Sequence, residues 1–523
     1  MDEAEAVRAS RPGATVLTAG AIRPDYRSGE TFRHVVLANG TVSALANTVA
    51  EAARAAGSSA SWVDLGSACV GPGFIDTHIH ALQAAADASL VSLRAATSLA
   101  DLLSAVRERG VGRPAHQWTV TRRNWHESQL REGRLPTTAE LDALGTPGPI
   151  LLRRGSHLAV LNSRATALLN VRETAPAHGD AVIARALELA GEPSLAERQE
   201  DLAAVMARFN ARGITSIREA GIDAADNELF RVLRAQGRLT LRCDLLWRVS
   251  EGSDVDSALR QIADMPTDGI ASPYARLTGV KVFVDGRIAD ASSLRMTAED
   301  LWAVVEASLR RSGGVGCHAV GDVAVRTVLD VYERALSARL ARPQQLVIEH
   351  ALQCTPETIH RLAASGVGVS AHPSIVYEFA DDIRRHWGQE GAARAAPLRD
   401  MVSAGVRVAA GSDGDVPPFD PLLGIWFMVT RQGRSGGPIG AGQAVTRNVA
   451  LDLYTRRGAE LLGVEARRGD LRPGMDADLV AFSTDPLSCP IDELPDTEIL
   501  LTLLGGRAVY DPARLMEEAG PDG

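Results

Sequence analysis

Short apolar runs alternate with amphipathic stretches through most of this 523-residue chain. The apolar runs have the length of strands, and the stretches between them repeat apolar residues at helical spacing. The predicted strands are residues 74–80, 150–154, 215–219, 278–284, 315–319, 346–350, 367–371 and 406–412. The predicted helices include residues 98–108, 195–211, 298–311, 323–338 and 356–365.

A strand followed by a helix, repeated in this way, indicates an α/β protein with a parallel sheet and crossover helices. Eight such strands favour a closed (β/α)8 TIM-like barrel. An open doubly wound sheet has the same period, so the period alone leaves that alternative open. No glycine-rich phosphate-binding motif follows the first predicted strand, and we interpret the isolated Gly71 and Gly73 as turn residues that lead into that strand.

Both ends of the chain follow a different pattern, with short β segments separated by turns. On the N-terminal side these segments are residues 15–18, 34–37 and 62–65, and on the C-terminal side they are 478–482 and 499–502. We therefore predict that residues 1–72 and 467–523 together form a small, discontinuous β-sandwich domain. Residues 73–466 then form the barrel.

Composition narrows the class of protein. Hydrophobic residues make up 45% and charged residues 23%, as in globular domains. The net charge of −10 argues against a nucleic-acid partner, and no apolar stretch is long enough to span a bilayer. The five cysteines form no CxxC pair, and the acidic start Met1-Asp2-Glu3 lacks the features of a secretory signal. We expect a cytoplasmic protein with a small-molecule substrate, and a homodimer is one possible assembly.

Lys281 is the only lysine among 55 basic residues, and the others are arginine. It lies in the apolar strand predicted at residues 278–284, where an uncompensated ammonium group would be costly. A lysine amine can lose its proton in a suitable pocket, whereas a guanidinium stays charged. A surface lysine that survived a bias toward arginine is the alternative, but the buried setting favours a chemical role.

The strongest motif is Gly73-Phe74-Ile75-Asp76-Thr77-His78-Ile79-His80. Residues i and i+2 of a strand point to the same side, so His78 and His80 can present two imidazoles to one metal ion. Both lie at the C-terminal end of a strand, where barrel enzymes build their sites. Two histidines that only pack and hydrogen-bond remain the alternative for this pair taken alone.

Three further polar residues each end a different predicted strand: His318, His350 and Asp413. The carboxyl ends of parallel strands meet at one rim of a barrel, so these side chains would gather there with His78, His80 and Lys281. Histidine and carboxylate groups in such a cluster predict a divalent metal site. Asp413 as a simple turn residue is the alternative for that position.

The order of these residues, with His-x-His on the first strand, lysine on the fourth, histidine on the fifth and sixth and aspartate on the eighth, resembles the amidohydrolase superfamily. The sequence around these residues is similar to the YtcJ-like branch of that superfamily, the amidohydrolase family 3 proteins, which include N-substituted formamide deformylases. The matching segments are residues 72–80, 157–163, 213–216, 280–286, 318–322, 348–351, 411–413 and 474–480. The resemblance spans nearly the whole chain and does not specify a substrate.

The resemblance implies that carbon dioxide carbamylates Lys281, which then bridges two divalent ions. It implies that His78 and His80 hold one ion with Lys281 and Asp413, and that His318 and His350 hold the second with Lys281. Zinc suits these ligands best, with iron, manganese or nickel as alternatives and either one or two ions bound.

The expected reaction is hydrolysis of a non-peptide C–N bond in an amide, N-acyl or formamide group. Zinc lowers the pKa of its bound water to about 7, so hydroxide is available near neutrality. Asp413 would act as general base and then as general acid toward the leaving nitrogen. Ester or lactone hydrolysis, metal-assisted isomerisation and a catalytically silent binding protein are the alternatives.

Other residues carry weaker signals. Asp322 either orients a ligand histidine or caps the following helix. Strand-end arginines, Arg218 among them, either bind a substrate carboxylate or form surface ion pairs. The side chains predicted to contact substrate are Trp125, His157, Arg154 and His372. Packing of a loop is the alternative for Trp125, and a structural role is the alternative for His157.

Three departures from the family pattern lie on the substrate side of the site. His126 follows Trp125 where aspartate is common, and His372 precedes a proline where glutamine is common. The segment after Gly286 is short. We therefore expect the substrate pocket to differ in shape from those of the relatives.

Overall fold

The computed structural model describes residues 13–87, 90–123, 125–155, 158–171, 178–191, 194–267, 270–414 and 418–517. His157 and the acidic start of the chain, which both entered the sequence predictions, lie outside these ranges. The chain divides into two compact units, which are described separately. The first comprises Met1–His80, Met206–Gly414 and Pro418–Gly523, and the second comprises Ala81–Val205 and Asp415–Pro417.

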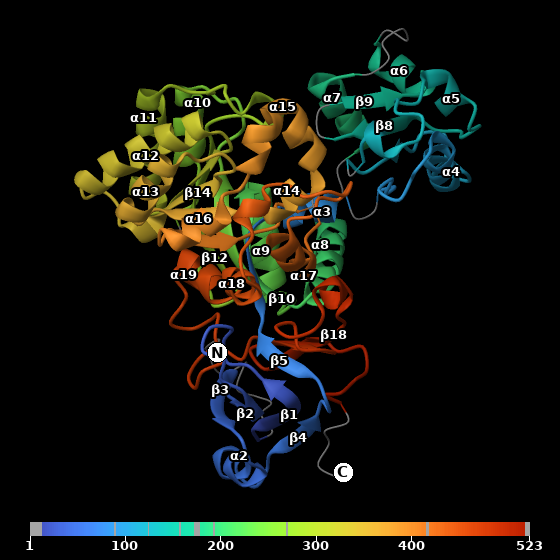
Figure 1. Cartoon of the computed structure of the whole chain (residues 1–523). Coiled ribbons are helices and arrows are strands. Elements are labelled where there is room, and N and C mark those ends of the chain that lie inside the picture. The colour runs from blue at the N-terminus through green and yellow to red at the C-terminus, as the bar shows by residue number, and fades with distance from the viewer. Residues whose placement is uncertain are drawn as a thin grey trace. The chain divides into compact units, whose positions relative to one another are not determined.

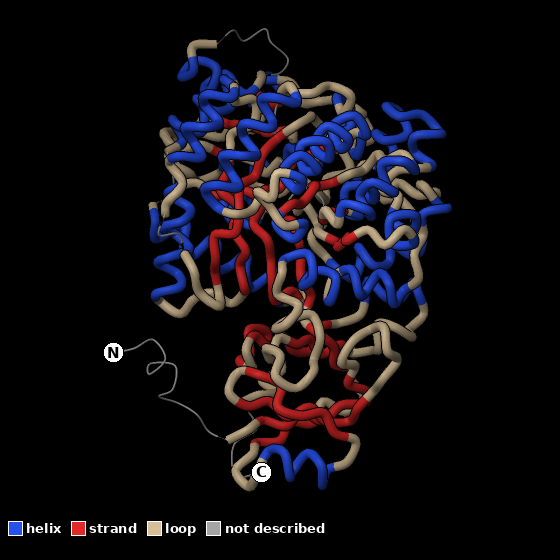
Figure 2. Tube along the Cα trace, turned by 90° about the vertical axis from the view of Figure 1, so that its left-hand side faces the viewer, coloured by secondary structure: helices blue, strands red, loops and turns tan. Residues whose placement is uncertain are grey.

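Eight parallel strands form the barrel of the first unit, which confirms the predicted fold class (Figure 1). Their order is β6 (Phe74–Ile79), β10 (Ile214–Ile222), β11 (Arg242–Arg248), β12 (Ala275–Phe283), β13 (Val315–Ala319), β14 (Leu346–His350), β15 (Gly368–Ala371) and β16 (Arg407–Ala410). Figure 2 shows these strands enclosed by helices. The helices of this unit after β10 are α9 (Ala224–Ala235), α10 (Val255–Ala263), α11 (Ala298–Ser312), α12 (Asp322–Ser337), α13 (Pro356–Ser365), α14 (Pro373–Glu378), α15 (Ala380–Ala393), α16 (Leu398–Ser403), α17 (Pro421–Thr430), α18 (Arg447–Leu453) and α19 (Arg456–Leu462).

Backbone hydrogen bonds join the first barrel strand to the segment that follows the last one. Asp413 N donates to His78 O over 2.8 Å, and His80 N donates to Gly414 O over 2.7 Å. The Asp76 carboxylate adds a side-chain bond, because its Oδ1 accepts from Ser412 N over 2.9 Å. The barrel is therefore closed at the level of the His-x-His motif.

One predicted barrel strand is wrong and another was missed. Ile150–Arg154 is β8, which pairs with β7 and β9 outside the barrel. The missed strand is β11, whose first and third residues, Arg242 and Asp244, are charged yet buried. Ion pairs with Asp478 and Arg276 make this burial tolerable. One strand was counted too many before β10 and one too few after it. The lysine therefore still lies on the fourth barrel strand, the two later histidines on the fifth and sixth, and the aspartate after the eighth.

Helix ends follow ordinary capping chemistry. Thr297 Oγ1 accepts from Asp300 N at the start of α11, and Gly313, with φ 73°, ends that helix. Thr355 caps α13 in the same way, and Pro356 occupies its first turn. These signals explain why both helices were predicted from sequence to within one residue.

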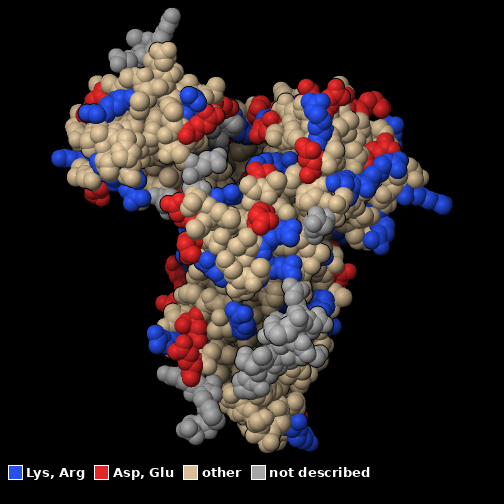
Figure 3. Space-filling model, turned by 180° about the vertical axis from the view of Figure 1, so that it is seen from behind, with Lys and Arg blue, Asp and Glu red and all other residues tan. Residues whose placement is uncertain are grey.

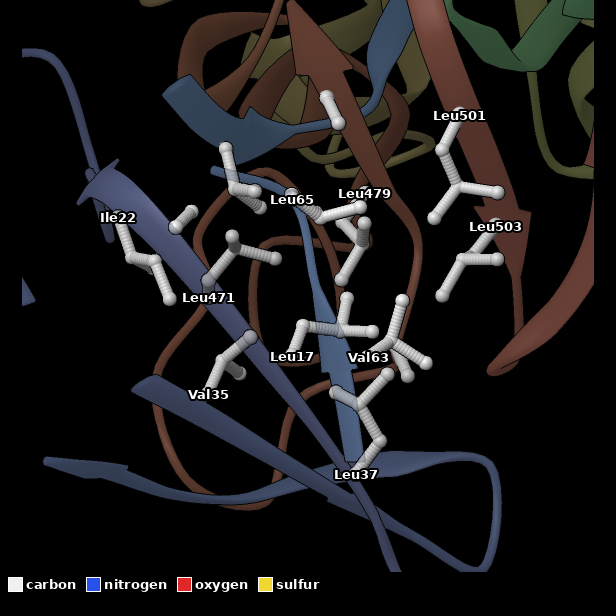
Figure 4. Packing of buried hydrophobic residues seen from close by; sticks show 14 of the residues in the cluster. Leu17, Ile22, Val35, Leu37, Val63, Leu65, Leu471, Leu479, Leu501 and Leu503 are labelled. Atoms are coloured by element: carbon white, nitrogen blue, oxygen red, sulfur yellow. The ribbon is translucent and has the colours of Figure 1, made fainter. Parts of the chain in front are cut away.

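Segments from both ends of the chain form a separate sheet in the first unit, as predicted for the small β-sandwich. Its strands are β1 (Thr15–Ile22), β2 (Phe32–Ala38), β3 (Thr41–Ala46), β4 (Ser61–Asp64), β5 (Cys69–Pro72), β17 (Leu479–Phe482), β18 (Ile499–Leu504) and β19 (Arg507–Tyr510). Helix α2 (Val49–Ala56) follows β3. Strands β5 and β17 pair antiparallel and so join the two ends. Leu17 and Val35 pack with Leu479 and Leu501 in a common core (Figure 4).

The second unit has its own small sheet and apolar clusters. The sheet consists of β7 (Thr119–Val120), β8 and β9 (Leu158–Leu161). Its helices are α3 (Ala81–Ala86), α4 (Leu99–Gly110), α5 (Thr138–Asp142), α6 (Ser163–Leu169) and α7 (Asp180–Ala190), and α8 (Leu195–Asn210) runs on into the first unit. Leu102 and Val106 of α4 pack with Ile150 and Leu152 of β8. The sequence pattern did not separate this segment from the barrel, because its strands and helices alternate in the same way.

Surface charge and helix length are relevant to the expectation that the chain has no nucleic-acid partner and no membrane span. Acidic and basic side chains are interspersed on the face drawn in Figure 3, without a broad basic area there. Within the described part of the chain, no helix combines the length and apolar character needed to cross a membrane.

Candidate functional site

The His-x-His motif lies beside Asp413 where the barrel closes. The Nε2 atoms of His78 and His80 are each 3.2 Å from Asp413 Oδ1. Lys281 on β12 places its Nζ 3.5 Å from His78 Nε2. His78 and Lys281 are each 1% exposed, whereas the His80 side chain is 37% exposed and open to solvent. These residues thus form a cluster that is buried on one side and accessible on the other.

The two remaining predicted ligands lie next to this cluster. The ring centroids of His318 and His350 are 4.3 Å apart, and the His350 ring is 5.3 Å from that of His78. His372 belongs to the same group, with its ring 4.3 Å from His350 and 4.4 Å from His78. The structure therefore brings together all six residues predicted as metal ligands, plus His372.

Fixed hydrogen-bond acceptors determine which nitrogen of two histidines carries the proton. His78 Nδ1 lies 2.7 Å from Glu349 Oε2, and His318 Nε2 lies 3.0 Å from the carbonyl oxygen of Gly286. A carboxylate or a carbonyl oxygen can only accept, so these nitrogens donate. The other nitrogen of each neutral ring, Nε2 of His78 and Nδ1 of His318, keeps its lone pair for a ligand.

The donor set fits a divalent cation. When His78 is neutral, with its proton on Nδ1, the lone pair of its Nε2 faces the ionised Asp413 Oδ1 at 3.2 Å and neither atom has a proton to share. Ligand atoms of His78, His80 and Asp413 all lie within 4.8 Å of one another, as do those of His350, His372 and Asp413. A positive ion is the natural partner for converging lone pairs of imidazole and carboxylate.

Glu349 and Arg218 form an ion pair behind the histidines; sequence reasoning missed Glu349 and this role of Arg218. Arg218 Nη1 donates to Glu349 Oε1 over 2.6 Å, and both side chains are buried. Arg218 is thus neither a surface ion pair nor a group facing solvent. Burial would raise the pKa of Glu349, but Arg218 and His78 outweigh it and hold that pKa well below its ordinary value. The sequence signal was a glutamate directly before His350 in an otherwise apolar strand.

The environment alters the pKa values of the lysine and the aspartate. Burial lowers the pKa of Lys281 below its ordinary value, although Glu349 and Asp413 act in the opposite direction. Burial would raise the pKa of Asp413, but contacts with His78 and His80 outweigh it, so the pKa lies well below its ordinary value. The site therefore favours an ionised aspartate and eases loss of the lysine proton.

Two of the clustered residues have unusual backbone conformations. His350 has φ 77° and Asp413 has φ 55°, in the left-handed region that non-glycine residues seldom adopt. His350 is the last residue of β14, and Asp413 lies three residues after the end of β16, so these conformations turn the chain at the rim where the side chains gather. Such conformations concentrate at functional sites, where surrounding structure maintains them.

The other predicted site residues that the structure describes have partners of their own. Trp125 is buried in the core of the second unit, and its indole N–H donates to the Arg153 carbonyl. Arg154, in the same unit, pairs with Glu127 over 2.6 Å. Asp322 accepts hydrogen bonds from Thr355 N and the Thr358 hydroxyl, so it ties α12 to the start of α13.

Asp285, rather than Asp322, lies beside a candidate ligand histidine, His318. Its Oδ1 is 3.6 Å from His318 Nε2, and its carboxylate accepts from the backbone N–H groups of Val320 and Gly321. The sequence contained this residue in the motif at residues 280–286 without assigning it a role.

Comparisons with known proteins agree with this geometry. A model of the amidohydrolase family matches residues 61–510. The N-substituted formamide deformylase of Arthrobacter pascens is 28% identical to this chain, covering 91% of it and 94% of that enzyme. The putative amidohydrolase YtcJ of Bacillus subtilis is 25% identical, covering 86% and 90%.

A crystal structure of an uncharacterized metal-dependent hydrolase from Pyrococcus horikoshii is similar in fold, with a TM-score of 0.74. It is 21% identical and covers 92% of this chain, which in turn covers 99% of that chain. The sequence matches confirm the resemblance read from the motifs, and the structural match confirms the fold. This chain belongs to the amidohydrolase family.

Proposed function

We propose that this chain is a metal-dependent hydrolase of a non-peptide C–N bond, with an amide, N-acyl or formamide group as substrate. The observation that carries the proposal is the convergence of His78, His80 and Asp413, whose ligand atoms lie within 4.8 Å of one another at the rim of the barrel. Family membership and the relative described as an N-substituted formamide deformylase support the choice of bond.

The residues of the site have two roles, metal binding and proton transfer. His78, His80, Lys281, His318, His350 and Asp413 would hold one or two divalent ions, with zinc as the best match to their nitrogen and oxygen atoms. When bound, the metal supplies an activated water and polarises the substrate carbonyl. Asp413, ionised and 19% exposed, takes the proton of the attacking water and delivers it to the leaving nitrogen.

Lys281 has the properties that carbamylation requires. Its neutral amine would form an N–C bond to carbon dioxide and release one proton, which leaves an anionic carbamate. The side chain is 1% exposed, and burial lowers its pKa, so the neutral form is easier to reach. An arginine guanidinium stays protonated and cannot follow this route.

The first test is metal content per chain for the wild type and for Lys281→Arg, both purified with bicarbonate and zinc. We expect one or two transition-metal ions in the wild type and a loss of metal in the variant. Arg310→Lys is the matched control, because its side chain is 65% exposed and it changes the same pair of residue types. A Lys281→Arg variant that keeps full metal content would contradict the carbamate.

The substrate class is tested with an N-substituted formamide and the formate ester of matching size. We expect turnover of the formamide by the zinc-loaded wild type, and a fall of roughly 10²-fold or more in kcat for Asp413→Asn. Turnover of the ester alone would contradict the proposed bond class. A zinc-loaded protein that hydrolyses neither compound nor any member of a wider amide panel would contradict the hydrolase assignment.

A further inference from the structure

His372 lies in the histidine cluster with its possible ligand atom within 4.8 Å of those of His350 and Asp413, yet it is not among the six residues proposed to hold the metal. Its side chain has no exposed surface, and it precedes Pro373 at the start of α14. Its Nδ1 is 2.6 Å from His350 Nδ1, and its Nε2 is 3.2 Å from the Ser370 hydroxyl. Two imidazole nitrogens at hydrogen-bond distance need one proton between them, so the question is which ring carries it.

A chain of hydrogen bonds answers that question, because it ends at a carbonyl oxygen. Thr77 Oγ1 lies 2.9 Å from the Ala410 carbonyl oxygen and 2.7 Å from Ser370 Oγ. The carbonyl can only accept, so the single hydroxyl proton of Thr77 points to Ala410. Thr77 must then accept from Ser370.

The same reasoning continues through Ser370 to the imidazole. Because the only hydroxyl proton of Ser370 is donated to Thr77, its oxygen must accept from His372 Nε2–H. A neutral His372 with a proton on Nε2 has a lone pair on Nδ1, the atom that faces His350. His350 Nδ1 must therefore carry the proton and donate it. The lone pair of His350 is left on Nε2.

We infer that His372 is a positioning residue that fixes the tautomer of His350, so that His350 offers Nε2 as its metal-binding atom. This inference rests on the proposed metal site. The arrangement parallels Glu349, which fixes His78 by accepting from its Nδ1. Three strands and the residue before α14 contribute to this hydrogen-bond chain. Thr77 lies on β6, Ser370 on β15 and Ala410 on β16, and His372 directly precedes α14; all four residues are buried.

The direct test reads proton positions in the wild-type protein. Histidine labelled with ¹⁵N gives long-range ¹H–¹⁵N spectra that distinguish protonated, free and metal-bound ring nitrogens, with resonances assigned by comparison with single-histidine variants. We expect His372 protonated on Nε2 and His350 protonated on Nδ1 before and after zinc is added. Zinc should shift Nε2 of His350 and leave Nδ1 of His372 free of metal. A metal-bound Nδ1 in His372, or a His350 protonated on Nε2, would overturn the inference.

Variants provide a second readout by zinc affinity at fixed pH. His372→Leu removes the acceptor, and we expect it to weaken zinc binding by roughly 10- to 100-fold. His372→Gln keeps an acceptor, since its amide oxygen can take the His350 Nδ1–H, and should retain affinity close to that of the wild type. His360→Leu is the control, because His360 is exposed on α13.

Two failures remain distinguishable. A wild type that binds no zinc contradicts the proposed function, whereas the proton positions are still read from the metal-free protein. A wild type that binds zinc tightly, alongside a folded His372→Leu with the same affinity, overturns the role of His372 and leaves the proposed function standing.

Discussion

Arg218 Nη1 lies 2.6 Å from Glu349 Oε1 inside the barrel, where the two side chains are 6% and 0% exposed. The other carboxylate oxygen of Glu349 accepts from His78 Nδ1. An ion pair from β10 to β14 therefore fixes the orientation of a histidine on β6. Burying two charges is costly unless they are paired and hydrogen-bonded, so the pair and the histidine depend on one another.

Replacing Glu349 with glutamine should destabilise the fold and weaken metal binding. The amide leaves Arg218 without a compensating charge, and breaking a buried pair costs about 3–5 kcal/mol. The free energy of unfolding, measured with urea on metal-free protein, provides the check. Glu306→Gln breaks an exposed pair with Arg310 on α11 and should cost about 0.5 kcal/mol or less. Equal losses in the two variants would contradict a special role for the buried pair.

Gly316 on β13 leaves the space that the Arg218–Glu349 pair occupies. A Cβ at this position would lie 2.4 Å from Glu349 Oε1 and 2.8 Å from Arg218 Nη2. Gly316→Ala should therefore displace the pair, with a loss of stability of about 1–3 kcal/mol, as in other overpacked interiors. Gly442→Ala is the control, because nothing lies within 4 Å of its added Cβ. Thermal unfolding and zinc content of both variants test this; unchanged values for Gly316→Ala would count against the steric argument.

Stability should depend on pH through Asp285. Burial raises the pKa of Asp285 from 3.8 to about 7, against the effect of the backbone hydrogen bonds that it accepts. Between these two values the folded state binds a proton that the unfolded state has released. The contribution of Asp285 to stability is therefore complete below pH 3.8 and falls by about 1.4 kcal/mol per pH unit up to about pH 7.

Urea unfolding of metal-free wild type and Asp285→Asn across this pH range isolates the contribution of Asp285. The asparagine does not titrate, so the stability of the variant relative to the wild type should rise with pH. A difference that stays constant between pH 4 and pH 7 would show that Asp285 has an ordinary pKa.

The sequence predicted the strands that are apolar and the residues that end them. Period-2 and period-3.6 patterns located β13, β14 and α13, because propensity, capping and burial agree there. The same rules failed for β11, where Arg242 and Asp244 are buried because oppositely charged residues that are distant in the sequence pair with them. They failed again for β8, since an apolar strand has the same pattern whichever sheet it joins.

The candidate site shows a similar division. His78 and Asp413 could be predicted because residue type and strand end together indicate a ligand. The roles of Glu349 and His372 depend on which atoms face each other across the barrel, at 2.7 Å and 2.6 Å, and no spacing in the chain encodes that distance. The residues that contact the candidate ligands from behind therefore required the structure, whereas the candidate ligands themselves could be proposed from the sequence.

Asp478 connects the sheet formed by the chain ends to the barrel strand β11. Its two oxygens accept from Arg242 Nε over 2.5 Å and Nη2 over 2.9 Å, and both side chains are buried. Asp478→Asn removes the charge but keeps an oxygen for the Gly505 N–H. Asp476, 3.4 Å from Arg242, still compensates part of the charge, so we expect a loss of about 3 kcal/mol, at the lower end for a broken buried pair.

This loss should leave metal binding intact, which separates Asp478 from Glu349. Arg242 is the first residue of β11, whereas the candidate ligands gather at the opposite, C-terminal ends of the strands. Zinc bound per folded chain should therefore match the wild type at a temperature where Asp478→Asn is folded. Asp330→Asn, which removes an exposed partner of Arg361, should change neither stability nor zinc content measurably. If Asp478→Asn loses zinc while still folded, the two ends of the barrel are coupled, because an ion pair at one end then determines the geometry of the ligands at the other.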